Sequence, residues 1–136
     1  MNDSINDNDS AQSNSQTFSV ADWKKLKEEM RDILVGVART CSTITYSELA
    51  SAMRTAHMHQ RAPLFHKLIR DMDRDERRAG RPSLAALVVR KDSGIPGQGF
   101  FSGVNTAEGD SFDPEVYWRA EFDKVCDYWG EQLKLL

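Results

Sequence analysis

The run SLAALVV at residues 83–89 is uncharged and aliphatic, and residues that break regular structure close it at both ends. Gly80 and Pro82 precede the run, and two glycines and a proline follow it at 94–97. Short aliphatic runs bounded in this way are typical of a buried strand. The rest of the chain must supply helices that cover the strand, so the sequence predicts a mixed α+β domain.

An amphipathic helix and a short strand are predicted ahead of this run. At 23–37 apolar residues recur at spacings of three and four, and Ser19 or Asp22 is placed to cap the first turn. The sequence STITY at 42–46 has the β-branched and aromatic composition of a strand. It leads directly into SELASAM, where Ser47 is expected to cap a second helix.

Two further helices are bounded by proline and glycine. Pro63 suits the first turn of a helix because an N–H has no partner there, and Gly80 ends the same helix. Asp113 and Pro114 are expected to begin a last helix as its cap and first turn. The apolar stripe of that last helix carries three large aromatic side chains, Trp118, Phe122 and Trp129.

The stretch RKDSGIPGQGFF at 90–101 allows two interpretations. Phosphate-binding loops show GxGxxG or GxxxxGK[ST], whereas the spacing from Gly94 is GxxGxG and no Lys-Ser/Thr pair follows. A turn explains the composition better, with positive φ angles at Gly94 and Gly97 and with GFF at 99–101 as a returning strand. We therefore expect a hairpin whose loop, residues 90–98, forms a wing.

The predicted order is helix, short strand, helix, helix, strand, loop, strand, helix. That is the layout of an α+β winged helix-turn-helix with a flanking C-terminal helix. Residues 18–136 are expected to form this single domain, because a chain of 136 residues supplies one core. Residues 1–17 are rich in Asn, Asp, Ser and Gln and are expected to be a disordered N-terminal tail.

Targeting, redox and metal signals are weak. No run approaches the roughly 18 apolar residues of a membrane helix and no signal peptide is visible, so a cytoplasmic location is predicted. Cys41 and Cys126 lack a CxxC spacing and are expected to be buried thiols. His57, His59 and His66 are expected to be packing or surface residues, with no metal and no cofactor.

The net charge of −3 conceals a segregation of charge along the chain. Residues 1–17 carry three Asp and no Lys or Arg, and residues 61–91 carry nine basic and four acidic side chains. Residues 92–136 carry three basic and nine acidic side chains. One basic and one acidic surface are therefore expected. A basic surface is compatible with nucleic-acid binding even though the net charge of the chain is negative.

Duplex DNA is the predicted partner, bound without catalysis by the third helix and the wing. Phosphate contacts are expected from Lys67, Arg70, Arg90 and Lys91. Contacts with base edges are expected from Arg61, His66 and Arg74, and the full set of site residues also includes Tyr46, Ser47 and Gln98. The alternative is a solvated helix face on which arginines pair with the acidic residues at 71–76.

A protein-interaction module, or an accessory subunit of a larger enzyme or defence system, is the competing function. The aromatic stripe of the last helix offers more surface than a small core usually needs. Packing on the first helix explains that stripe, and an interface with a partner or a second copy explains it as well.

The motif TITYSELA at 43–50 resembles the segment that opens the DNA-binding part of alkylguanine-DNA alkyltransferases and alkyltransferase-like proteins. LVVRKDSGIPGQGFFSG at 87–103 is similar to the strand, turn and glycine-phenylalanine run that closes the same part. The resemblance implies a winged helix, with Tyr46 near the DNA backbone and a recognition helix around 61–74. Alkyl transfer is not expected, because Ala85 stands about where those enzymes place the cysteine of a Pro-Cys-His-Arg motif.

A second resemblance covers more of the chain. It is to small bacterial proteins that share T-Y-x-E-L-A and, further on, G-x-P-x-L-x-A-L-V-V-x-K-x-x-G-x-P-G-x-G-F. The lysine of that pattern falls at Arg90 or Lys91. This resemblance implies no particular activity.

Overall fold

The computed structural model describes residues 18–102 and 112–134, with side chains as far as Gly130. Its class is mixed α+β, with helices predominating. The elements in chain order are α1 (Val20–Arg39), β1 (Ile44–Thr45), α2 (Tyr46–Ala52), α3 (Pro63–Arg78), the 3₁₀ helix η1 (Leu84–Leu87), β2 (Val88–Val89), α4 (Gln98–Phe101) and α5 (Pro114–Lys134). The tail predicted at residues 1–17 lies outside the described residues.

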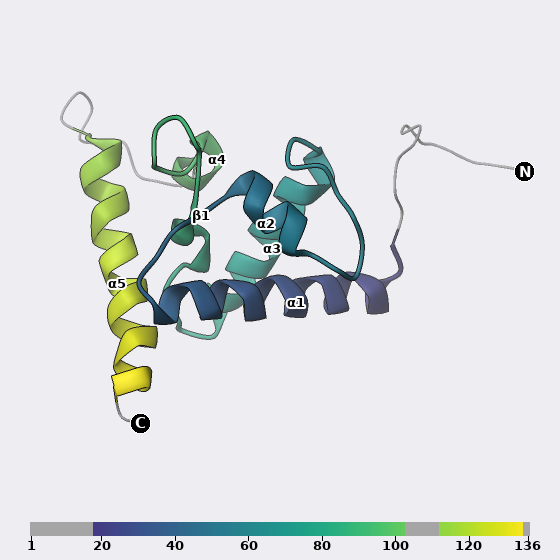
Figure 1. The fold of residues 1–136 in the computed structure, drawn as a ribbon, viewed down its shortest axis with the longest axis horizontal. Coiled ribbons are helices and arrows are strands. Elements are labelled where there is room, and N and C mark those ends of the chain that lie inside the picture. Colours follow the sequence, from purple (N-terminus) through teal and green to yellow (C-terminus); the bar gives the residue numbers. More distant parts are fainter. Residues whose placement is uncertain (1–17, 103–111, 135–136) are drawn as a thin grey trace, which may run out of the picture.

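The long helix α1 is the base on which the other elements pack (Figure 1). Helix α3 lies against it along much of its length, α5 crosses it near its C-terminal end, and η1 contacts all three helices. The core fills the space between them with fully buried side chains such as Leu26, Leu34, Phe65, Leu84 and Leu87. None of the described helices is long and apolar enough to cross a membrane.

Local capping explains most helix boundaries. The Ser19 hydroxyl accepts a hydrogen bond from the Asp22 amide at 3.0 Å, which confirms Ser19 as the cap of α1. Pro63 occupies the first position of α3, as predicted. The prediction for Ser47 is wrong, because the Thr45 hydroxyl caps α2 by accepting a bond from the Glu48 amide. The Glu48 carboxylate accepts a bond from the Thr45 amide, which completes a capping box.

The end of α3 and the start of α5 also follow the predicted signals. Helix α3 ends at Arg78, and Gly80 adopts a φ of +81° just beyond it. The Asp113 carboxylate accepts bonds from the Glu115 and Val116 amides at 3.0 and 3.4 Å, so Asp113 caps α5 as expected. Pro114 is the first residue of that helix.

The aliphatic run 83–89 is not the single strand that its composition predicts. Its first part is η1, and only Val88–Val89 form a strand, which pairs in parallel with β1 through Ile44↔Val88 and Thr45↔Val89. A buried carboxylate explains the difference: Asp73 accepts bonds from the Ser83 hydroxyl and the Ala85 amide at 2.9 and 3.0 Å. These bonds stabilise a helical turn at the start of the run, as a cap does.

The predicted hairpin is also wrong. GFF at 99–101 belongs to the short helix α4 rather than to a returning strand. Gly94 has the expected positive φ of +76°, whereas Gly97 is extended and precedes α4 as its N-cap. The loop closes on itself through bonds of 2.9 Å from the Arg90 amide to the Ile95 carbonyl and from the Gly94 amide to the Arg90 carbonyl. Residues 90–97 therefore form a compact loop that needs no second strand.

The prediction of two buried thiols is wrong, because Cys41 and Cys126 form a disulfide. Cys41 lies in the exposed turn after α1 and has a positive φ of +53°, and Cys126 is half-buried on α5. The sequence separation of 85 residues gave no local signal for this pairing. Disulfides are more typical of oxidising compartments, so the cytoplasmic location stays a prediction.

The aromatic stripe of α5 is used for packing within the chain. Trp118, Phe122 and Trp129 are buried in the core, and the Trp118 indole donates a hydrogen bond of 2.7 Å to the Ala86 carbonyl. These three side chains are therefore not available as a partner surface. Val116 and Tyr128 are the large apolar side chains that the described part of α5 leaves exposed.

Candidate functional site: a cationic pocket

A pocket of about 580 Å³ opens between α2, α3, β2 and the segment that follows it. Sites for small ligands usually measure about 300–1,000 Å³, so the volume suits a ligand group. Eight of the ten predicted site residues line the pocket: Tyr46, Ser47, Arg61, His66, Arg70, Arg90, Lys91 and Gln98. They come from the helices α2, α3 and α4 and from the loops at 53–62 and 90–97, which only the tertiary fold brings together.

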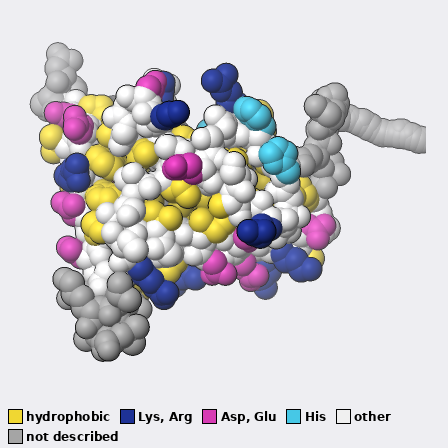
Figure 2. All heavy atoms as spheres, in the orientation of Figure 1, with side chains coloured by type: hydrophobic (Ala, Val, Ile, Leu, Met, Phe, Trp, Pro, Cys, Tyr) yellow, Lys and Arg dark blue, Asp and Glu magenta, His cyan; other side chains and the backbone are white. Residues whose placement is uncertain are grey.

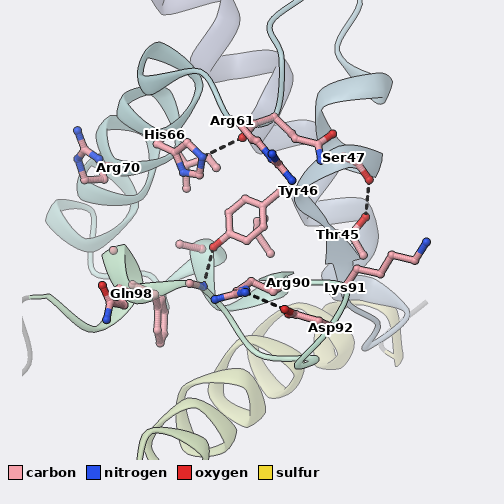
Figure 3. A pocket seen from close by; sticks show the side chains of 17 residues that line it. Thr45, Tyr46, Ser47, Arg61, His66, Arg70, Arg90, Lys91, Asp92 and Gln98 are labelled. Carbon is pink, nitrogen blue, oxygen red and sulfur yellow. Dashed lines mark hydrogen bonds and ion pairs between the residues drawn. The ribbon is translucent and has the colours of Figure 1, made fainter.

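The Tyr46 ring stands in the middle of the pocket (Figure 3). Its hydroxyl accepts a bond of 2.9 Å from the Gly97 amide, which ties the first residue of α2 to the end of the 90–97 loop. Burial raises the pKa of the Tyr46 hydroxyl, although the Gly97 amide and nearby Arg90 act in the opposite direction. The phenol therefore stays neutral at ordinary pH.

His66 packs on the Tyr46 ring with 5.4 Å between the ring centres. Its Nε2 lies 2.8 Å from the Gln60 carbonyl oxygen. Because a carbonyl only accepts, Nε2 is the donor in this contact. His66 thus holds the tyrosine on one side and leaves one ring nitrogen for a ligand or for water.

Four cations, here called the rim cations, line the pocket: Arg61, Arg70, Arg90 and Lys91. Arg90 forms an ion pair of 2.7 Å with Asp92, the one carboxylate among the lining residues. The side chains of Arg61, Arg70 and Lys91 form no ion pair within the described part of the chain. Without His66, the four cations and one carboxylate of the lining give a net charge of +3.

The lining also has an apolar floor. Ile69, Ala85, Val88 and Phe100 contribute to it. Asp73 fixes the position of Ala85 through the hydrogen bonds at the start of η1. A pocket with a cationic rim and an apolar floor is suited to an anion that carries a flat or apolar group.

Lys67 and Arg74, also predicted as DNA contacts, do not line the pocket. Both form ion pairs with Asp71, at 2.8 and 2.9 Å, on the neighbouring face of α3. Burial raises the pKa of the Asp71 carboxyl, but the hydrogen bonds from Lys67 and Trp23 and the nearby charges lower it by more. The net pKa is below its ordinary value, so the carboxyl stays ionised. The spacing of 67, 71 and 74 is the i,i+4 and i,i+3 spacing of helical ion pairs, so the sequence contained this signal.

The cations near the C-terminal end of α3 are also neutralised within the chain. Arg77 pairs with Asp73 at 3.0 Å, and Arg81 pairs with the buried Glu76 at 2.8 Å. Figure 2 shows the same mixing along the lower edge of the molecule, over α1, where basic and acidic side chains alternate. A second hollow of about 490 Å³ is lined by Arg77, Arg81 and Lys124, each of which forms an ion pair with a carboxylate of the chain.

Two kinds of reactive site, an activated Ser47 hydroxyl and a metal-binding cluster, are not seen in the part of the chain described. The Ser47 hydroxyl lies 3.3 Å from the Thr45 hydroxyl, and neither is bonded to a general base there. No group of three His, Cys, Asp or Glu side chains within 18–102 and 112–134 could hold a metal ion.

Comparisons of the chain with protein-family models, with curated proteins and with solved structures find no match. The resemblances drawn from TITYSELA and from the 87–103 run therefore depend on those motifs alone. Residues that the sequence did not single out as site residues, Gln60, Asp92 and Phe100, lie in the lining because the fold brings them there.

Proposed function

We propose that the chain binds DNA through the rim cations and uses the pocket to hold part of the bound strand. The observation that carries this proposal is the presence of Arg61, Arg70 and Lys91 around one hollow, each without an ion pair in the described chain. Phosphate oxygens are the natural partners of such cations. The helices α2 and α3 would act as the helix-turn-helix pair, and the 90–97 loop would take the place of the wing.

The shape of the pocket indicates which form of DNA should bind best. A smooth duplex backbone does not fill a hollow of about 580 Å³, whereas an unpaired nucleotide offers both a phosphate for the rim and a base for the apolar floor. Tyr46 and His66 supply ring surfaces beside that floor. DNA with an unpaired nucleotide should therefore bind more tightly than the matched perfect duplex.

We propose a non-enzymatic role for this site. The resemblance to alkyltransferases places Ala85 at the position of their acceptor cysteine, and a methyl side chain accepts no alkyl group. Ala85 lines the floor of the pocket, where such an acceptor would meet its substrate. Binding, rather than transfer, is the activity that these residues support.

Fluorescence anisotropy with labelled DNA tests the proposal. The arms are a duplex, the same duplex with one unpaired nucleotide, and the single strand, each measured between about 50 and 200 mM salt. Arg61→Ala/Arg70→Ala should weaken binding about tenfold or more and reduce the salt slope by roughly 2. The matched control is Arg39→Ala/Arg78→Ala, which removes two exposed cations outside the pocket. Equal effects of the two double variants would contradict a site at the rim.

An acidic protein partner is the second candidate. The pairing of Lys67, Arg74 and Arg77 with carboxylates of α3 favours it, because a DNA-binding helix usually leaves such cations for the groove. Carboxylates of a partner would then occupy the same rim. Binding to protein but to none of the DNA arms, with the same loss in Arg61→Ala/Arg70→Ala, would support this function instead.

A further inference from the structure

We propose that the Cys41–Cys126 disulfide is a redox switch of the cationic pocket, and that its reduction by a dithiol weakens ligand binding. The inference rests on the proposed function for the identity of the ligand, which is DNA with an unpaired nucleotide. It adds a means of regulation from outside the pocket, because neither cysteine belongs to the lining.

The turn at Cys41 has the hydrogen bonds of a Schellman motif, a helix ending that usually contains glycine. The Cys41 amide donates to the Ala38 carbonyl at 2.9 Å, and the Ser42 amide donates to the Val37 carbonyl at 3.2 Å. Cys41 occupies the glycine position, with a φ of +53°. A residue with a side chain is disfavoured in this conformation by about 5–30-fold, so the turn depends on contacts that offset this preference.

The disulfide is the bond that ties this turn to another helix. The hydrogen bonds of residues 40–43 in the described chain stay within residues 37–42, and the Thr40 hydroxyl, for example, bonds to the Val37 carbonyl. The disulfide instead reaches α5, across 85 residues of sequence. Without it, the conformation of Cys41 is held only by bonds within the end of α1.

The turn leads directly into the strand pair beside the pocket. Strand β1 begins three residues after Cys41 and pairs with β2. Thr45 of β1 and Val88 of β2 line the pocket, and Tyr46 follows Thr45 as the first residue of α2. A change in the direction of the turn therefore moves β1, and with it the Tyr46 ring, relative to the 90–97 loop.

Helix α5 holds both of the segments that lead into the strand pair. The disulfide fixes the turn before β1, and the Trp118 indole bonds at 2.7 Å to the Ala86 carbonyl in η1, before β2. Reduction removes the first link and leaves the second. We expect η1 and β2 to stay in place in the reduced chain, whereas β1 gains freedom and the bond between Tyr46 and Gly97 is broken for part of the time.

The reduction is a thiol–disulfide exchange that begins at Cys41, which is exposed, whereas Cys126 is half-buried. A thiolate of the dithiol attacks the Cys41 sulfur, so that a mixed disulfide forms and Cys126 leaves as a thiolate. The second thiol of the reductant then attacks its own sulfur in the mixed disulfide and releases Cys41. The dithiol loses two electrons and two protons and becomes a cyclic disulfide, and the two cysteines gain them as thiols.

The size of the effect follows from the population of the binding-competent arrangement. If the reduced chain keeps that arrangement for about 10–30% of the time, its apparent affinity falls about 3–10-fold. A disulfide that only constrains the unfolded chain would leave the folded pocket and its affinity unchanged. Ligand affinity therefore distinguishes a switch from a purely stabilising bond.

The test compares the oxidised chain, the chain reduced with dithiothreitol, Cys41→Gly/Cys126→Ser and Cys41→Ser/Cys126→Ser. The two double variants both lack the disulfide and differ only in the turn, where glycine adopts a positive φ freely and serine does not. One readout is the Kd for the labelled duplex with one unpaired nucleotide. The second is the pair of amide NMR signals of Tyr46 and Gly97 without DNA, and circular dichroism reports whether each sample is folded.

We expect reduction and Cys41→Ser/Cys126→Ser to weaken DNA binding by about 3–10-fold and to shift both amide signals. Cys41→Gly/Cys126→Ser should stay within about twofold of the oxidised chain, because glycine keeps the turn without the disulfide. Neither double variant should respond to dithiothreitol. Oxidised glutathione should restore the affinity of the reduced chain.

The proposal is overturned if the oxidised and reduced chains have the same Kd and the same Tyr46 and Gly97 signals. Equal weakening in the glycine and serine variants also overturns it, since the turn would then not control the pocket. Global unfolding on reduction overturns it as well, because a switch requires a folded reduced chain. Failure of every form to bind DNA would end the proposed function, and the two amide signals would still decide this inference.

Discussion

The Gly97 amide donates a hydrogen bond of 2.9 Å to the Tyr46 hydroxyl, across 51 residues of sequence. This single bond links the start of α2 to the loop that bears Arg90 and Lys91. It also places the tyrosine ring between Arg61 on one side and Arg90 on the other (Figure 3). The shape of the pocket therefore depends on a contact that neither segment makes locally.

Tyr46→Phe should destabilise the fold by about 0.5–1.5 kcal/mol, because the half-buried Gly97 amide loses its acceptor. Urea unfolding measures this cost. Tyr128→Phe is the matched control, since its exposed hydroxyl has no hydrogen bond in the described chain and its removal should change stability by less than about 0.5 kcal/mol. Equal stability of the two variants would mean that the Gly97 bond contributes nothing.

Sequence reasoning succeeded where the determining contacts are local. Ser19 and Asp113 bond to amides two or three residues away, and Pro63 acts through its own ring, so the boundaries of α1, α3 and α5 follow from short patterns. It failed at 83–89, because the carboxylate that holds η1 comes from Asp73 on another helix. A non-local cap of this kind leaves no trace in the run itself.

The candidate site also combines features that the sequence predicts with features that only the fold shows. The segment that carries Arg61 and Arg70 was recognisable from its charge, yet only the fold shows that these residues share a hollow with Arg90. Lys67, a predicted phosphate contact, forms an ion pair with Asp71 at the i,i+4 spacing that is visible in the sequence. Charge counts along a sequence thus overestimate the cations that remain for a ligand.

Reduction of the Cys41–Cys126 disulfide should lower stability by roughly 4–5 kcal/mol in the chain-entropy description, because the bond closes a loop across 85 residues. Cys41 is exposed, so a dithiol reductant has access to it. Denaturant unfolding with and without reductant measures the effect.

The double variant Cys41→Ser/Cys126→Ser is the control for that experiment. It should match the reduced chain in stability and should not respond to reductant. A chain whose stability is the same in both conditions would show that the link between the 40–43 turn and α5 is not needed for the fold.

The free energy of unfolding should decrease in acid because the Glu76 carboxylate becomes protonated. Burial raises the pKa of its carboxyl, but the hydrogen bonds from Arg81 and Arg31 lower it more, so the folded value lies below the ordinary 4.5. A lowered folded pKa means that the stabilisation is complete above the unfolded value and is lost as pH falls through the folded one. Unfolding free energies at pH 7, 4.5 and 3 should therefore decrease in that order.

Glu76→Gln tests the origin of this pH dependence. At pH 7 it should cost less than the roughly 3–5 kcal/mol of a fully buried ion pair, because Arg31 and Arg81 are 33% and 29% exposed. Its stability should also fall less steeply between pH 4.5 and 3. Glu115→Gln, at an exposed position, should leave both the stability and its slope unchanged.

Trp118→Phe should show that α5 supports the floor of the pocket. The substitution keeps an aromatic ring in the core but leaves the buried Ala86 carbonyl without its 2.7 Å bond from the indole, at a cost of about 1–3 kcal/mol. Because Ala86 follows Ala85, the amide NMR signals of η1 should shift as well. Asp123→Asn, at an exposed position of α5, is the control, and shifts confined to α5 in Trp118→Phe would argue against a link to the pocket.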